Sequence, residues 1–170
     1  EREVVLGLDF GTSCVKVVIG DAALGKAFAV PFCLAEGIEK FLLPTRLYQT
    51  GALFSLDEGT HSHRDLKLSL LAAQGDPVLR LRVVAFMALV IRRARSWFLA
   101  EHEKVYARTS IFWKLTVGLP AAQHLQTPFS ELFEHLSRAA WVAAGACGAL
   151  CGAWASWASC RGSCQRGRPV

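Results

Sequence analysis

The residues best suited to chemistry lie in a short polar stretch near the start of the chain, Asp9-Phe10-Gly11-Thr12-Ser13. Glycine lets a backbone approach a ligand closely, and the hydroxyl and amide groups of Thr12 and Ser13 can donate hydrogen bonds to an anion such as phosphate. Asp9 offers the carboxylate that Mg²⁺ prefers, alongside waters and phosphate oxygens. On these residues alone, the stretch predicts either a Mg-phosphate site or an ordinary hairpin with a polar turn.

Histidines and cysteines supply two further candidate sites, both for a metal ion. The cysteines of the C-terminal part form two pairs in which three residues separate the partners, Cys147 with Cys151 and Cys160 with Cys164. Zinc knuckles typically separate their cysteines by two residues. His61 and His63 stand in a polar stretch that we interpret as a loop, where histidines are usually solvated. We therefore expect free thiols and solvated histidines here.

The composition indicates one folded domain without a strongly charged partner. The chain has 170 residues, of which 52% are hydrophobic, and a formal net charge of +5. Nucleic-acid binders usually present a dense basic face, so no nucleic-acid partner is expected. The cysteine distribution and the absence of a signal peptide predict a reducing, cytoplasmic location. Residues 139–160 carry no formal charge but are mostly Ala, Gly, Ser and Cys, so a membrane span is not expected.

The elements that must position the polar stretch follow from hydrophobic periodicity. Apolar runs on both sides of residues 9–13 predict a glycine-turn hairpin, and Pro31 favours either an edge position or the end of a third strand. Asp76 followed by Pro77 is typical of a helix start. The expected elements are strands at 26–34, 45–48, 52–56 and 111–117, and helices at 65–73, from 76 to about 100, and from about 127. This order favours an α/β domain with a mixed sheet.

The longer string Leu6-Gly7-Leu8-Asp9-Phe10-Gly11-Thr12-Ser13 resembles the first phosphate motif of the actin, hexokinase and heat-shock ATPase superfamily. Within that superfamily, the later segments 43–48, 65–67 and 114–120 are most similar to the 70-kilodalton heat-shock chaperone family. The likeness covers about residues 3–144. It implies a ribonuclease H-like, actin-like ATPase fold with a mixed sheet and flanking helices. Residues 1–145 would form a partial N-terminal lobe, and 146–170 a tail rich in Ala, Gly, Cys and Arg.

The resemblance also implies roles for individual residues. Gly11, Thr12 and Ser13 would hold the β- and γ-phosphates of ATP, and Asp9 would organise a hydrated Mg²⁺. Lys67 would lie beside the γ-phosphate and stabilise negative charge during transfer, although a solvated helix lysine is an equal alternative from the residue pattern. Hydrolysis in this family drives a conformational switch, and its partners are protein clients and co-chaperones.

The chain departs from the family after about residue 145, where a second phosphate motif and an adenosine-binding motif are expected but absent. No Asp or Glu follows Glu134. We therefore expect little or no ATP hydrolysis by this chain alone. Lys16 lies three residues after Ser13, a spacing that resembles FGGY-type carbohydrate kinases, which are the alternative enzyme class. A non-catalytic actin-like scaffold that associates with itself through the incomplete lobe is the other alternative.

Overall fold

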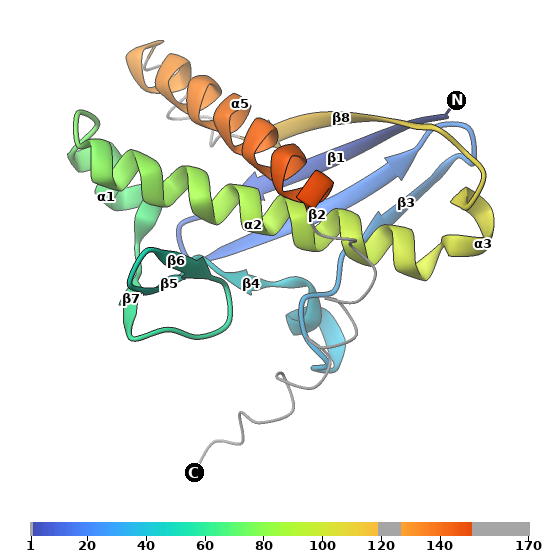
Figure 1. Ribbon diagram of the computed structural model, residues 1–170, viewed down its shortest axis with the longest axis horizontal. Coiled ribbons are helices and arrows are strands. Elements are labelled where there is room, and N and C mark those ends of the chain that lie inside the picture. The colour runs from blue at the N-terminus through green and yellow to red at the C-terminus, as the bar shows by residue number, and fades with distance from the viewer. Residues whose placement is uncertain (1, 119–126, 151–170) are drawn as a thin grey trace.

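Figure 1 shows the computed structural model of the chain, which describes residues 2–118 and 127–150, with side chains described for 2–118 and 128–145. The strands are β1 (Arg2–Phe10), β2 (Cys14–Asp21), β3 (Lys26–Ala29), β4 (Leu43–Pro44), β5 (Leu47–Thr50), β6 (Leu53–Ser55), β7 (His61–His63) and β8 (Ile111–Gly118). The helices are the 3-10 helix η1 (Gly37–Phe41) and the α-helices α1 (Leu66–Ala72), α2 (Pro77–Glu101), α3 (Glu103–Tyr106) and α5 (Thr127–Leu150). The predicted α/β class is confirmed.

The main sheet is mixed, as predicted. Its strand order is β3-β2-β1-β8, and β4 adds a short pairing to β2. β1 runs antiparallel to β2, which confirms the glycine-turn hairpin, and parallel to β8. Alternate residues of β1 point to one face, so that Leu6, Leu8 and Phe10 are all buried. α2 and α5 lie side by side over the sheet (Figure 1) and cover this apolar face.

The long helix α2 begins where its capping signal predicted. The Asp76 side chain accepts hydrogen bonds from the amides of Val78 at 2.8 Å and Leu79 at 3.3 Å, and Pro77 is the first helical residue. The helix ends at Glu101, one residue beyond the predicted end. The apolar residues that recur at three- and four-residue spacing along α2 are all buried: Val83, Phe86, Met87, Val90, Ala94, Trp97 and Phe98. This apolar stripe is therefore part of the core.

Four short-strand predictions need correction. β3 ends at Ala29 instead of residue 34, because beyond it the Phe32 amide donates to the Lys40 carbonyl, away from the sheet. The predicted strand 45–48 shifts to β5 at 47–50, residues 43–44 form the separate strand β4, and 52–56 shortens to β6. His61 and His63 were predicted in a loop, but they belong to β7, whose backbone pairs with β5. The sequence of β7 has no alternation of apolar and polar residues, so it does not predict a strand.

Arg95 of α2 contacts both β8 and α5. Its guanidinium lies 5.1 Å from the centroid of the Trp113 ring on β8 and 5.5 Å from that of Trp141 on α5. Burial lowers the pKa of Arg95 from its ordinary value. A guanidinium between two indole rings gains cation–π attraction from both, so Arg95 fixes α5 against the edge of the sheet.

A buried polar cluster lies at the C-terminal end of β2, around Asp21. Asp21 is 1% exposed and accepts hydrogen bonds from the Tyr106 hydroxyl and from the amides of Ala23 at 2.8 Å and Leu24 at 3.1 Å. Burial alone would raise the pKa of Asp21, but these hydrogen bonds and the Arg2 charge hold it below 3.8. Burial, followed by the hydrogen bond and the charge of Asp21, raises the pKa of Tyr106 to about 12.

Replacing Tyr106 with phenylalanine should lower the free energy of unfolding by about 2 kcal/mol near neutral pH, because it removes a hydrogen bond to a buried charge. The lowered pKa of Asp21 gives stability that is present above pH 3.8 and lost as the pH falls through its folded value. The raised pKa of Tyr106 gives stability that is present below pH 10.0 and lost as the pH rises toward 12. Urea unfolding over a range of pH checks this prediction. The difference in the free energy of unfolding between wild type and Tyr106→Phe should become smaller at low and at high pH. If this difference does not change with pH, it does not come from the hydrogen bond between Tyr106 and Asp21.

Among the helices of the described ranges, none is both long enough and apolar enough to cross a membrane. The uncharged stretch 139–160 is described only as far as Leu150, in α5. The predicted tail, 146–170, otherwise lies outside the described residues.

Candidate functional site

The turn of residues 11–13 connects β1 to β2. It lies at the edge of the sheet where the parallel strands β1 and β8 have their carboxyl ends. Asp9, near the end of β1, is in register with Gly118, the last residue of β8. In open α/β sheets, ligands bind beyond the carboxyl ends of parallel strands. The turn therefore occupies the edge of the sheet where such a ligand is expected.

Gly11 is required by the shape of this turn. A Cβ atom at position 11 would lie 2.3 Å from the Cys14 carbonyl oxygen, far inside contact distance. The Gly11 amide donates to the Asp9 carbonyl at 3.1 Å. Gly11 thus makes the tight turn possible, and its own amide is already engaged. Its role in holding phosphate stays a prediction.

Three carbonyl groups of the turn are held by side chains and backbone from outside the hairpin. Lys67 Nζ donates to the Phe10 carbonyl at 2.9 Å, and Thr45 Oγ1 donates to the Gly11 carbonyl at 2.9 Å. The Thr45 amide donates to the Ser13 carbonyl, also at 2.9 Å. With these carbonyls drawn to the protein side, the amides of Thr12 and Ser13 bond to no acceptor within the described part of the chain. Successive amides of this kind form a concavity suited to an anion.

Lys67 comes to the turn from 57 residues away in the sequence. It lies on the short helix α1, whose Leu66 and Leu70 are buried, and its side chain is itself only 2% exposed. The solvated-lysine alternative is therefore wrong. Burial lowers the pKa of Lys67 from 10.5, whereas the Asp9 charge opposes this shift. The structure brings a buried cation to the same turn that carries Thr12 and Ser13.

Asp9 and Lys16 form an exposed ion pair beside the turn. Lys16 Nζ lies 3.6 Å from Asp9 Oδ2, because the two residues face each other across the hairpin. Asp9 is free to bind through water on its solvent side. No group of three or more His, Cys, Asp or Glu that could hold a metal ion occurs among the described residues. A single carboxylate fits Mg²⁺, which takes its remaining ligands from waters and phosphate oxygens.

Thr45 is the site residue that the sequence did not reveal. It is 4% exposed, and it contacts the turn through both its hydroxyl and its amide. The sequence predicted a strand at 45–48, but it did not indicate which strand lies beside it. β4 pairs with the start of β2, with Cys14 opposite Pro44, and this register delivers Thr45 to the turn.

The two histidines lie on β7, outside the turn. His63 Nε2 lies 2.9 Å from Gln49 Oε1 on β5, and His61 is exposed. Cys14 and Cys33 are free thiols. The side chains of Cys147, Cys151, Cys160 and Cys164 lie outside the described ones, so their predicted state as free thiols stays a prediction.

The fold and the turn together define a mixed α/β domain with helices flanking a mixed sheet and a concave backbone turn at the carboxyl end of its parallel strands. Comparison of the chain with protein-family models, with curated proteins and with solved structures gives no match. The resemblance to the heat-shock chaperone family thus stays a prediction from the motifs.

Thr45→Val should loosen the turn without changing the size of the side chain. The loss of the hydrogen bond to Gly11 should lower the free energy of unfolding by about 1 kcal/mol, and anion binding at the turn should weaken. Thr116→Val is the matched control, because among the described residues the Thr116 hydroxyl makes no hydrogen bond. Chemical unfolding of both variants checks the prediction, and equal effects would contradict it.

Proposed function

We propose that the turn of residues 11–13 binds the phosphate groups of Mg-ATP, in a partial ribonuclease H-like lobe of the heat-shock chaperone type. The observation that carries the proposal is the contact between Lys67 Nζ and the Phe10 carbonyl at 2.9 Å. A lysine so deeply buried is costly unless it is used. The resemblance assigns Lys67 to the γ-phosphate, and the contact brings it to the residue next to the phosphate turn.

The phosphates would be bound mainly by backbone groups. The amides of Thr12 and Ser13 would donate to the β- and γ-phosphate oxygens, and both hydroxyls would add further donors. Gly11 would permit the close approach, since even one methyl group there meets the Cys14 carbonyl. Asp9 would hold Mg²⁺ through water, and the ion would neutralise phosphate charge.

Lys67 would supply positive charge beside the terminal phosphate. An ammonium group has three donors, so one can remain on the Phe10 carbonyl while the others reach the ligand. Its burial makes the charge effective, because the low local dielectric strengthens its attraction to phosphate. The hydrogen bond to the Phe10 carbonyl would fix the Lys67 ammonium group before the ligand binds. A charge that is already in place in this way can stabilise a transferring phosphoryl group.

We expect binding with little or no hydrolysis by this chain alone. Phosphoryl transfer to water needs a group that orients the attacking water as well as groups that hold the phosphates. Asp9, which supplies a carboxylate at the turn, already pairs with Lys16. Turnover at the rate of a complete ATPase of this superfamily would contradict this part of the proposal. Protein clients or co-chaperones are proposed from the family resemblance, and a cytoplasmic location is proposed from the cysteine distribution.

The experiment that tests the proposal is titration calorimetry of the full chain with ATP in the presence and absence of Mg²⁺, and with AMP. We expect Mg-ATP to bind at one site, ATP alone to bind more weakly, and AMP not to bind, because the contacts are with the β- and γ-phosphates. Equal binding of AMP and Mg-ATP would show that the turn does not hold the terminal phosphates. Absence of heat with all three, together with no thermal stabilisation, would overturn the proposal.

The carbohydrate-kinase alternative is less well supported by the geometry. It would use Lys16 near the phosphates, yet Lys16 lies 3.6 Å from Asp9 on the exposed side of the hairpin. An assay for sugar phosphorylation with Mg-ATP distinguishes the two classes of enzyme, since a phosphorylated sugar would be formed only by the kinase.

A further inference from the structure

A groove beside the free edge of the main sheet is separate from the proposed nucleotide site. Its volume is about 780 Å³, and it lies between β8 and α5. Leu115 and Val117 of β8 and Phe133 and Trp141 of α5 form its apolar walls. The Trp141 ring is fixed by its contact with Arg95, so this wall is built into the fold.

The groove continues along an open backbone edge. β8 pairs with β1 on one side, and no strand pairs with its other side in the ranges that the structure describes. Soluble proteins often protect such edges with proline, a bulge, a charged side chain such as lysine, or a covering segment. β8 has eight regular residues without proline, and its one lysine, Lys114, is held by Glu3 at 2.7 Å. The edge is therefore able to accept another strand.

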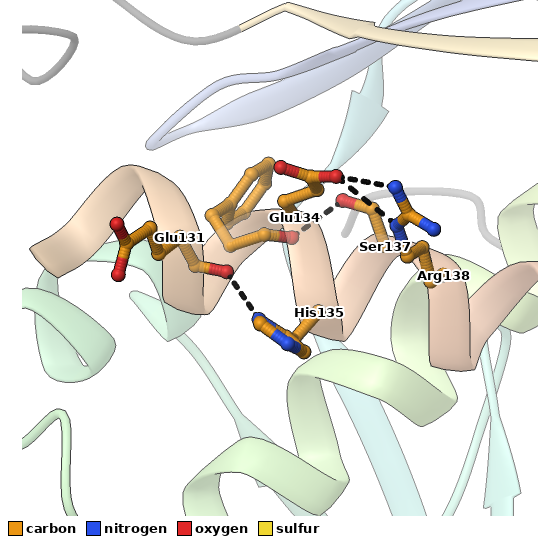
Figure 2. A network of polar contacts seen from close by, with 6 residues as sticks. Glu131, Glu134, His135, Ser137 and Arg138 are labelled. Atoms are coloured by element: carbon orange, nitrogen blue, oxygen red, sulfur yellow. Dashed lines mark hydrogen bonds and ion pairs between the residues drawn. The ribbon is translucent and has the colours of Figure 1, made fainter. Parts of the chain in front are cut away.

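The polar rim of the groove carries opposite charges four residues apart. Glu134 Oε1 and Arg138 Nη2 lie 2.6 Å apart, and their side chains are 62% and 77% exposed. Figure 2 shows this pair on the other side of α5 from His135, whose Nδ1 lies 2.8 Å from the Glu131 carbonyl. One turn further along the helix, Val142 is 69% exposed. The outer face of α5 thus combines a charged pair with an apolar residue.

This rim is complementary to itself. If a second α5 lies antiparallel beside the first, a two-fold axis passing between residues 134 and 138 places Glu134 of each copy opposite Arg138 of the other. The same axis turns β8 antiparallel to its copy, as strand addition across an edge requires. A helix of 24 residues spans about 36 Å, long enough for an interface of ordinary size.

We propose that two copies of this chain associate through the groove between β8 and α5, joining their sheets at β8. The charge pattern favours a second copy over an unrelated partner, because each copy supplies Glu134 to one ion pair and Arg138 to the other. The edge of β8 supplies backbone hydrogen bonds, and Val142 and the groove walls supply apolar area. This interface is independent of the nucleotide site.

The test uses the full chain under reducing conditions, so that cysteines cannot link the copies, with sedimentation measured over a range of concentrations. Wild type should dimerise. Glu134→Arg and Arg138→Glu should each weaken dimerisation at least about tenfold, because like charges then face each other. A mixture of the two single variants should restore the dimer as a heterodimer. In that mixture the ion pair within each helix stays broken, so recovery reports only pairing between copies.

Two control variants carry the same charge changes away from the groove. Glu36→Arg and Arg64→Glu alter exposed residues of other segments and should leave dimerisation unchanged. Circular dichroism verifies that all variants stay folded. If the wild-type protein is monomeric at every concentration, the proposal is overturned, and another segment or partner covers the groove. A dimer that the two rim variants and the control variants affect equally would overturn it as well.

Discussion

Replacing Gly11 with alanine should weaken Mg-ATP binding by about 10- to 100-fold, the equivalent of losing one or two hydrogen bonds to a charged group. The added Cβ would lie 2.3 Å from the Cys14 carbonyl oxygen. That oxygen belongs to the backbone, so the turn itself must move. The movement would turn the Thr12 and Ser13 amides away from the phosphates. Titration calorimetry on the folded variant measures the loss.

Gly20→Ala is the matched control for Gly11→Ala. Gly20 lies on the same hairpin, in β2, and a Cβ atom there would meet nothing within 4 Å. The control should bind Mg-ATP as wild type does. Because overpacking at position 11 also costs about 1–3 kcal/mol of stability, circular dichroism must first confirm that the Gly11 variant is folded. Unchanged affinity in a folded Gly11→Ala variant would show that the turn is not the phosphate site.

Replacing Lys67 with methionine should reduce Mg-ATP affinity at least about tenfold while leaving the protein as stable as wild type, or more stable. Methionine fills a similar volume and removes a buried positive charge, and such replacements are often neutral or stabilising. Loss of the charge removes the attraction to the terminal phosphate. Calorimetry and urea unfolding of the same preparation separate the two effects.

Lys16→Met is the control for the Lys67 variant. Lys16 is also a lysine close to the turn, but its side chain is 56% exposed and paired with Asp9. We expect its replacement to change affinity little. The reverse outcome, in which Lys16→Met abolishes binding and Lys67→Met does not, would favour the carbohydrate-kinase class.

The difference in the free energy of unfolding between wild type and Lys67→Met should also depend on pH in a defined direction. Burial lowers the pKa of Lys67 below 10.5, so between the folded and unfolded pKa values the unfolded chain binds more protons. The free energy of unfolding of wild type should therefore rise relative to Lys67→Met as the pH increases toward 10.5. A difference that stays constant with pH would mean that the lysine is not held in a desolvated position.

Elements with strong local signals could be predicted from the sequence. The β1–β2 hairpin follows from apolar runs around small residues, and α2 follows from its Asp76 cap and its apolar stripe. β8 was also predicted to within one residue. β7 was missed because pairing with β5, and not its own side chains, makes it a strand. The boundaries of the short strands depend on such partners.

The contacts that organise the candidate site depend on residues far apart in the sequence. Thr45 is 34 residues from Gly11, and Lys67 is 57 residues from Phe10. Motif resemblance suggested a role for Lys67 but could not show its burial, and nothing local distinguished Thr45 from other strand threonines. The pair Asp21 and Tyr106, separated by 85 residues, was invisible for the same reason.

Amide NMR of the isotope-labelled chain during titration with Mg-ATP tests the central claim most directly, because it reports on each donor of the turn. We expect the largest shifts at the Thr12 and Ser13 amides, with saturation at one site, and smaller shifts in α1 around Lys67. AMP should leave these resonances in place. If saturating Mg-ATP leaves the Thr12 and Ser13 amides unmoved, the turn does not bind phosphate and the proposed function is wrong.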